Sequence, residues 1–257
     1  MKLASLLIFF MCASMVTACC AQETVAHGLR LLTERRDKEA LAVFEQVLVD
    51  QPHNEDALWG KAEILIRFRR FKEAEALCSG VLLQNPDHAP TLTSLAYLRY
   101  KDNALPEAKK LVLRALRVPT FSAQDRAMAY MMLGAINSKK SSSGGLVNKV
   151  FYGTQIKGYF QKAVDTAPDL AETHLGLGSF YLMAPAIVGG DIDKAISELM
   201  KAIELAPSYA TAHVRLAQAY QKKGDQKQCN VSIAHAQALD PENEALQDFL
   251  RHEQSSH

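Results

Sequence analysis

The stretch AYQKKGDQKQC, residues 219–229, contains the corner that decides the fold. Helix-forming apolar segments stand on both sides of it. Gly224 tolerates the left-handed backbone that ends many helices, and Asp225 can accept hydrogen bonds from the first amides of the next helix. Cys229 then stands at a position that favours a small side chain, and a buried free cysteine behaves as a small hydrophobe. Taken alone the stretch is compatible with any surface turn. Together with the repeat that follows, it predicts two antiparallel helices joined by a Gly-Asp turn, with Cys229 buried between them.

Small residues recur along the chain with a period of 34 residues. Ala40, Ala74 and Ala108 are each 34 residues apart, and the same distance separates Ala195 from Cys229. Prolines mark the ends of the units, at Pro52, Pro86, Pro119, Pro168, Pro207 and Pro241. A fixed period of this length indicates stacked helix pairs rather than one globular core.

The repeated unit resembles the tetratricopeptide repeat (TPR) family. Its last copy carries the pattern best, with Leu216, Ala217 and Tyr220 before the turn, and Pro241 at its end. The resemblance implies an all-α fold, a right-handed α-solenoid of about six helix pairs followed by a capping helix. We expect the solenoid over residues 21–241, with pairs at 21–54, 55–88, 89–120, 127–170, 171–209 and 210–241, the capping helix at 242–253 and a disordered tail at 254–257.

Residues 1–18 are typical of a signal peptide. Lys2 precedes an apolar run that is too short to span a membrane comfortably. The sequence VTAC, residues 16–19, resembles the lipoprotein box of bacteria, which implies cleavage before Cys19 and lipid attached to that residue. The expected location is the bacterial cell envelope, with the protein anchored by lipid and facing the periplasm. Ordinary secretion, with cleavage after Ala18 or Ala21, is the alternative.

The composition argues against several classes of function. The net charge is +1 and no long run of one sign exists, so we expect no nucleic-acid partner. We find no nucleophile elbow, no glycine-rich cofactor fingerprint and no Cys/His ligand spacing, so we expect no enzymatic activity, cofactor or metal. His174 and His213 occupy the same position of consecutive units, where side chains usually pack between helices.

The first helix of each TPR pair lines the concave groove of the solenoid. The positions that correspond to groove contacts here are mostly apolar or aromatic. The candidate groove residues are Trp59, Glu63, Ile66, Tyr97, Tyr100, Met128, Met131, Leu175, Ser179 and Leu182. Trp and Tyr are frequent binding anchors, and methionine surfaces adapt to varied ligands. We therefore expect a non-enzymatic protein–protein interaction scaffold, which binds an apolar or amphipathic segment of a protein or peptide in the groove.

Two insertions interrupt the period. Residues 138–153 include SSSGG, a composition typical of a flexible connector. They also include LVNKVFY, residues 146–152, which is apolar enough that we expect it to fold back as a short helix turn. In the second insertion, at residues 183–189, we expect the helix to extend to Pro185, with a short apolar loop after it. The sequence leaves open whether these segments bind a partner, are tolerated surface insertions or fill the groove.

The second insertion also suggests an alternative function. Its sequence, FYLMAPAIVGGDIDKA at residues 180–195, resembles the stretched repeat of exported bacterial TPR proteins, including the lipoprotein component associated with some TRAP transporters. This resemblance implies an accessory component of a transporter that carries a small apolar ligand.

Overall fold

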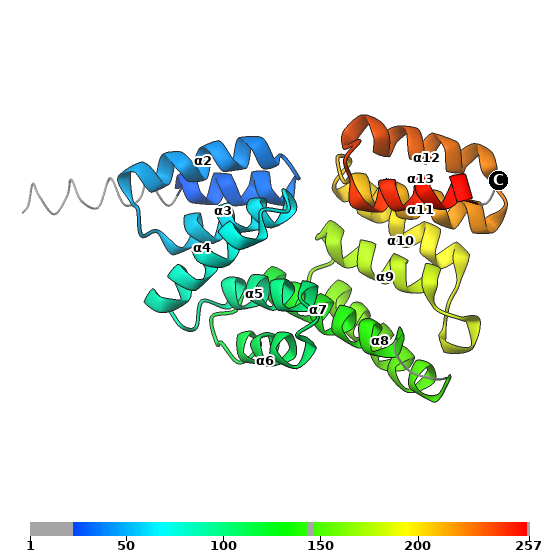
Figure 1. Ribbon diagram of the computed structural model, residues 1–257, viewed down its shortest axis with the longest axis horizontal. Coiled ribbons are helices and arrows are strands. Elements are labelled where there is room, and N and C mark those ends of the chain that lie inside the picture. The colour runs from blue at the N-terminus through cyan, green and yellow to red at the C-terminus, as the bar shows by residue number, and fades with distance from the viewer. Residues whose placement is uncertain (1–22, 143–145, 256–257) are drawn as a thin grey trace, which may run out of the picture. The chain divides into compact units, whose positions relative to one another are not determined.

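Helices are the only regular elements in residues 23–142 and 146–255, which are the residues that the computed structural model describes. Residues 23–33 are helical and precede the labelled helices of Figure 1. The labelled helices are α2 (Asp37–Asp50), α3 (Glu55–Arg67), α4 (Phe71–Gln84), α5 (Ala89–Lys101), α6 (Leu105–Ala115), α7 (Ala123–Ser142), α8 (Leu146–Thr166), α9 (Ala171–Met183), α10 (Ile192–Leu205), α11 (Ala210–Lys223), α12 (Gln226–Leu239) and α13 (Glu244–Ser255). A short 3₁₀ turn, η1 (Ala186–Val188), lies between α9 and α10. The predicted all-α fold of TPR-like helix pairs is confirmed. The predicted signal peptide and Cys19 lie outside the described residues.

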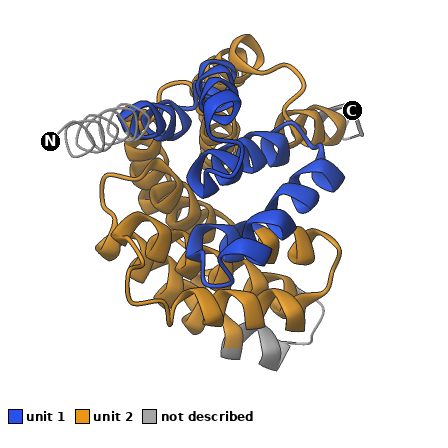
Figure 2. Cartoon of the chain, turned by 90° about the vertical axis from the view of Figure 1, so that its left-hand side faces the viewer, with its two compact units in different colours: residues 1–94 blue, residues 95–257 orange. Residues whose placement is uncertain are grey.

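The chain divides into two compact units, residues 1–94 and residues 95–257 (Figure 2). In the first unit, α2 packs on α3 and α3 packs on α4. In the second unit, consecutive helices from α6 to α13 pack on one another, and α9 also contacts both α7 and α11. Contacts with the next helix and with the corresponding helix of the next pair are those of a stacked helical array.

The Gly-Asp corner has the predicted geometry. Gly224 has φ +82°, and its amide donates to the carbonyl of Gln221. The Asp225 carboxylate accepts from the amide of Gln228 at 3.1 Å, so it caps α12. The same left-handed backbone occurs 34 residues apart at Arg35, Arg69 and Asn103, which have φ between 61° and 63°. The turn conformation therefore repeats even where glycine does not.

Small side chains lie where the helices of each pair cross. Ala40, Ala74, Ala108, Ala163, Ala195 and Cys229 are all at most 1% exposed. In the first unit the large Phe44 ring lies against two glycines. A Cβ placed on Gly28 would lie 2.7 Å from Phe44 Cε1, and one on Gly60 would overlap the ring. Because glycine has no side chain, Gly28 and Gly60 leave room for the Phe44 ring, which fills that space.

The insertion at residues 138–153 is mostly helical where the structure describes it. The flexible connector predicted for the Ser/Gly part is wrong at Ser141 and Ser142, and the short helix turn expected at residues 146–152 belongs to a long helix. α7 continues to Ser142 and α8 begins at Leu146, so the insertion lengthens both helices of the fourth pair. Ile136 and Ile156 are buried where the extended pair begins. Packing against a partner helix outweighs the weak helix propensity of serine.

The second insertion forms a constrained turn. α9 ends at Met183, two residues before the predicted end, and η1 follows. Gly189 has φ +99°, and a Cβ on Gly190 would overlap the carbonyl oxygen of Ala184. Val188 points inward and would lie 3.0 Å from a Cβ on Gly153 of α8. The two insertions therefore contact each other.

The last helix packs on the last pair. Leu246 and Phe249 of α13 belong to one core cluster with Val214, Ala217 and Cys229. The helix reaches Ser255, so residues 254–255 are helical rather than part of a disordered tail. Among the described residues, no helix is both long and apolar enough to cross a membrane.

We predict opposite effects for two glycine substitutions in the first unit. Gly60→Ala forces a methyl group into the Phe44 ring and should lower the free energy of unfolding by about 1–3 kcal/mol. Gly80→Ala meets nothing within 4 Å inside α4 and should raise it by about 0.5–1 kcal/mol. Chemical denaturation monitored by circular dichroism measures both. Equal effects of the two substitutions would contradict the packing described here.

Candidate functional site

The candidate groove residues lie on the first helices of four consecutive pairs. Trp59, Glu63 and Ile66 come from α3 in the first unit. The others come from α5, α7 and α9 in the second unit. We describe the two sets separately, as the α3 face and the α5–α9 face.

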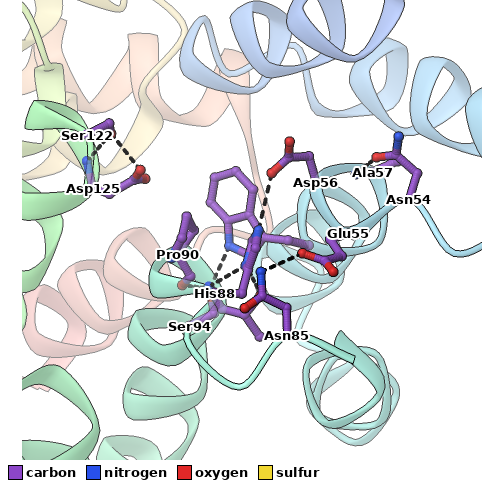
Figure 3. Close-up of polar contacts among 12 residues, drawn as sticks. Asn54, Glu55, Asp56, Ala57, Asn85, His88, Pro90, Ser94, Ser122 and Asp125 are labelled. Carbon is purple, nitrogen blue, oxygen red and sulfur yellow. Dashed lines mark hydrogen bonds and ion pairs between the residues drawn. The ribbon is translucent and has the colours of Figure 1, made fainter. Parts of the chain in front are cut away.

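The α3 face centres on a hydrogen-bond chain from Trp59. The indole Nε1 donates to Ser94 Oγ at 2.9 Å, and the Ser94 hydroxyl donates to the carboxylate of Glu63. Ser94 lies on α5 (Figure 3). Its side chain is buried, with 4% of the residue exposed. Sequence reasoning missed Ser94, although it stands 35 residues after Trp59, close to one repeat period. Because its N–H is already bonded, Trp59 offers mainly its half-buried ring to a partner.

A second polar cluster closes the end of the same helices. His88 Nδ1 lies 2.7 Å from Thr91 Oγ1, and His88 Nε2 lies 3.2 Å from Asp56 Oδ1 (Figure 3). The centre of the His88 ring is 6.4 Å from that of Trp59. These bonds fix the α5 start against α3 and hold the Trp59 ring in place. The arrangement suits binding, because each polar group named here has a partner within the fold.

The α5–α9 face begins with two tyrosines. The rings of Tyr97 and Tyr100 are stacked, with centroids 6.5 Å apart and planes at 29°. Lys139 Nζ lies 4.6 Å from the Tyr100 ring centroid and donates to the Tyr100 carbonyl at 3.0 Å. Burial raises the pKa of the Tyr100 phenol, so that group stays neutral at physiological pH. Both rings remain half-buried, as binding anchors often are.

Farther along, this face is used mostly for packing. Leu182 is 3% exposed and belongs to the central core of the second unit, so it is not placed to contact a partner. Leu175 and Met131 pack against the same core, and the end of Met131 covers Gly176. Met128 packs on a neighbouring cluster. The two methionines thus contact core clusters but are half-buried, as Ser179 is.

This part of the α5–α9 face is used for packing because α9 is buried on nearly all sides. Its buried residues are Ala171, Glu172, Thr173, His174, Gly176, Leu177, Gly178, Phe180, Tyr181 and Leu182. Helices α7, α8, α10 and α11 all contact it. A helix that is apolar all round is a core helix.

Three cations on first helices bind carbonyls of the preceding pair. Arg67 Nη1 donates to the Leu32 carbonyl at 3.0 Å in the first unit. In the second unit, Lys139 binds the Tyr100 carbonyl and Lys222 binds the Leu182 carbonyl at 2.9 Å. Each carbonyl stands near the C-terminal end of a first helix, where a cation is favourable. Long basic side chains at these positions join successive pairs.

His174 and His213 make the same contact in consecutive pairs. His174 Nε2 lies 2.8 Å from the Pro168 carbonyl, and His213 Nε2 lies 3.0 Å from the Pro207 carbonyl. His174 Nδ1 also lies 2.7 Å from Glu198. Burial lowers the pKa of His213. Both histidines hold the proline turn that precedes their own helix.

Metal binding and thiol chemistry have little support in the described residues. No group of three or more His, Cys, Asp or Glu side chains could hold a metal ion in residues 23–142 and 146–255. Cys78 and Cys229 are both buried. Burial raises the pKa of the Cys78 thiol to about 12, so the reactive thiolate is scarce.

Family models match two segments of the chain. Residues 31–96 match a tetratricopeptide repeat, and residues 189–224 match a TPR repeat. Over these two segments the chain is similar to tetratricopeptide repeats. TPR repeats generally serve as protein–protein interaction scaffolds that bind proteins or peptide segments, and TPR proteins are typically not enzymes.

One curated relative is the DnaJ homolog subfamily C member 7 homolog of Dictyostelium discoideum. It is 26% identical over 237 residues, which cover 92% of this chain and 43% of that protein. The chain therefore spans less than half the length of this relative.

Solved structures share the TPR fold. PilW, a type IV pilus biogenesis factor, is 18% identical, covers 90% of this chain and 98% of its own, and has a TM-score of 0.54. PilF of Pseudomonas aeruginosa is 15% identical, with coverages of 90% and 97% and a TM-score of 0.50. The human IFIT1 dimer with m7Gppp-AAAA is 19% identical, with coverages of 86% and 51% and a TM-score of 0.64. At these identities the likeness shows the fold alone.

We predict that Ser94→Ala disturbs the only tryptophan of the chain. Loss of the hydroxyl leaves the Trp59 N–H without its acceptor and should lower the free energy of unfolding by about 1–2 kcal/mol. It should also shift the fluorescence emission of the folded protein. Ser79→Ala, at an exposed site on α4, is the control and should change neither quantity appreciably. An unchanged emission spectrum in Ser94→Ala would refute the hydrogen-bond chain.

Proposed function

We propose that this protein is an exported, lipid-anchored TPR scaffold that binds an apolar or amphipathic segment of a partner protein. The observation that carries the proposal is the set of half-buried aromatic rings on first helices: Trp59 on α3, and Tyr97 with Tyr100 on α5. Leu182 is 3% exposed and packs inside the fold, so it takes no part in this role.

The aromatic rings favour an apolar contact. The Trp59 N–H is bonded to Ser94, and Lys139 covers one side of the Tyr100 ring. The remaining ring surfaces are rigid and lose little conformational entropy when a partner binds. Tyr97 and Tyr100 are three residues apart, so they stand on one side of α5. A partner helix meets such a row with its own apolar residues three and four positions apart.

The proposed export and lipid anchor rest on the first nineteen residues. An apolar run follows Lys2, and VTAC ends in Cys19. Several acyl chains on one cysteine anchor a protein more firmly than a single chain does. Such an anchor leaves the TPR helices outside the bilayer, where their faces can reach a partner.

We predict that a photoreactive group at Tyr97 captures the partner in cells. Tyr97→p-benzoylphenylalanine places the probe on the α5–α9 face, and the expected adduct maps to an apolar or amphipathic segment. The matched control is Tyr159→p-benzoylphenylalanine, a half-buried tyrosine on α8, a second helix of its pair. Mass spectrometry of the crosslinked peptides identifies the segment.

Adding Tyr100→Ala should reduce the Tyr97 adduct several-fold, because it removes the stacked neighbour. Equal adducts from positions 97 and 159, or adducts that map only to strongly charged segments, would argue against the proposed binding face.

We predict that Cys19→Ser abolishes incorporation of labelled palmitate in a bacterial host. Cys20→Ser is the matched control, because it changes the neighbouring thiol and leaves VTAC intact. It should retain the label and the membrane association of the wild type. Labelling that survives Cys19→Ser would exclude the proposed lipid site and leave ordinary secretion.

A further inference from the structure

The middle of the chain has a strong excess of positive charge. Residues 103–164 hold ten of the 29 lysines and arginines but only two of the 28 aspartates and glutamates. The formal net charge is therefore +8 in this stretch and −7 in the rest of a chain whose total is +1. Such an asymmetry indicates a local anionic partner rather than a general property of the surface.

Part of this charge is used inside the second unit. Four of the cations lie over aromatic rings: Arg126, Lys139, Lys157 and Lys162. Cation–π contacts of this kind stabilise the packing of the fourth and fifth pairs. They account for the presence of these residues without an external ligand.

A second group of cations lines the outer side of α6 and the turn after it. We call it the basic stripe, and it consists of Lys109, Lys110, Arg114 and Arg117, which are all exposed. The opposite side of α6 buries Ala108, Val112 and Ala115 in the fold. The stripe is therefore the solvent side of an amphipathic helix, and its charges do not support the core.

The two carboxylates near the start of α6 contact Arg99. Glu107 is the only carboxylate in the sequence of α6, and it lies 3.3 Å from Arg99 Nε. Arg99 also lies 3.6 Å from Asp102. Both carboxylates near the start of α6 are thus shared with Arg99 rather than with the stripe.

The basic stripe also has an apolar centre. Leu113 is 40% exposed and lies between the cations. Together with Pro106 and the stripe it lines a surface hollow of about 410 Å³. Lysine and arginine can spread their apolar stems beside such a leucine while their charged ends reach outward. This pattern matches a lipid surface, where anionic headgroups lie next to an apolar interior.

We propose that the basic stripe docks α6 on a bilayer that contains anionic phospholipids. The four cations contact headgroup phosphates, and Leu113 enters the boundary of the acyl chains. The contact uses no candidate groove residue and does not require a lipid on Cys19. The docking helix α6 is the second helix of its pair. The first helices of the second unit therefore remain available to a partner protein.

Cosedimentation with vesicles tests the proposal. The full chain, processed by its bacterial host, is mixed with vesicles of phosphatidylcholine alone or with about one third phosphatidylglycerol. We expect tighter binding to the anionic vesicles. Replacing the four cations of the basic stripe by glutamine should weaken that binding by at least about tenfold, because each cation near such a surface contributes about a fivefold factor. Binding to phosphatidylcholine alone should not change.

A matched variant separates position from total charge. It replaces four exposed cations elsewhere by glutamine: Lys38, Lys72, Lys227 and Arg251. It has the same net charge as the stripe variant and should bind anionic vesicles like the wild type. A third variant, Leu113→Gln, keeps every charge and should still weaken binding several-fold. Circular dichroism and thermal melting confirm that each variant is folded.

Three results would overturn the proposal. One is an unchanged preference for anionic vesicles in the folded stripe variant. Another is an equal loss in the stripe variant and its matched control. The last concerns polyglutamate. If polyglutamate binds the stripe as tightly as the vesicles do, and Leu113→Gln does not change that binding, the stripe is a site for an acidic protein. None of these results bears on the crosslink from Tyr97, so the proposed binding face is tested separately.

Discussion

The close crossing of two helices within each pair is the constraint on which the other features depend. It requires a small residue at one position of every repeat, and Ala40, Ala74, Ala108 and Cys229 are there, all at most 1% exposed. A larger side chain would hold the backbones apart. Volumes are complementary around these positions, since the Phe44 ring fills the space over Gly28 and Gly60 while Leu199 lies against Gly178. Each pair still exposes an apolar side, which the next pair covers, so the array is stable only as a stack.

The sequence was sufficient to predict the helix pairs, because a 34-residue period records the crossing positions directly. It also placed the Gly224–Asp225 corner and the buried Cys229 correctly. It failed at Ser141 and Ser142, where local composition favours a connector but α7 continues, and it predicted only a short helix turn at residues 146–152, where α8 is a long helix. It also missed Arg35 and Arg69, because a turn conformation held by its neighbours does not need glycine. Helix propensity describes the preference of an isolated segment, whereas packing against neighbouring helices determines the structure of that segment in the folded chain.

The candidate site was harder to predict than the fold. The repeat positions correctly placed Trp59, Tyr97 and Tyr100 on first helices, since helical periodicity fixes which residues share a side. The pattern could not show that four other helices contact α9, which makes Leu182 part of the core and packs the half-buried Met131 against it. Nor could it show that Ser94 occupies the Trp59 N–H, or that Arg67 and Lys222 bind carbonyls of the preceding pair. Those contacts join different repeats, and a single-repeat pattern does not contain them.

The apolar interior is divided among successive pairs, and this has a consequence for how the chain is made. Phe44 belongs to one cluster, Leu199 to another and Leu246 to a third. A chain with one shared interior must be complete before it can bury that interior, whereas here each pair needs only the pair beside it. Folding can therefore proceed in step with the arrival of the chain, one hairpin after another. Amide hydrogens should then exchange at graded rates, fastest at the ends and slowest in α9.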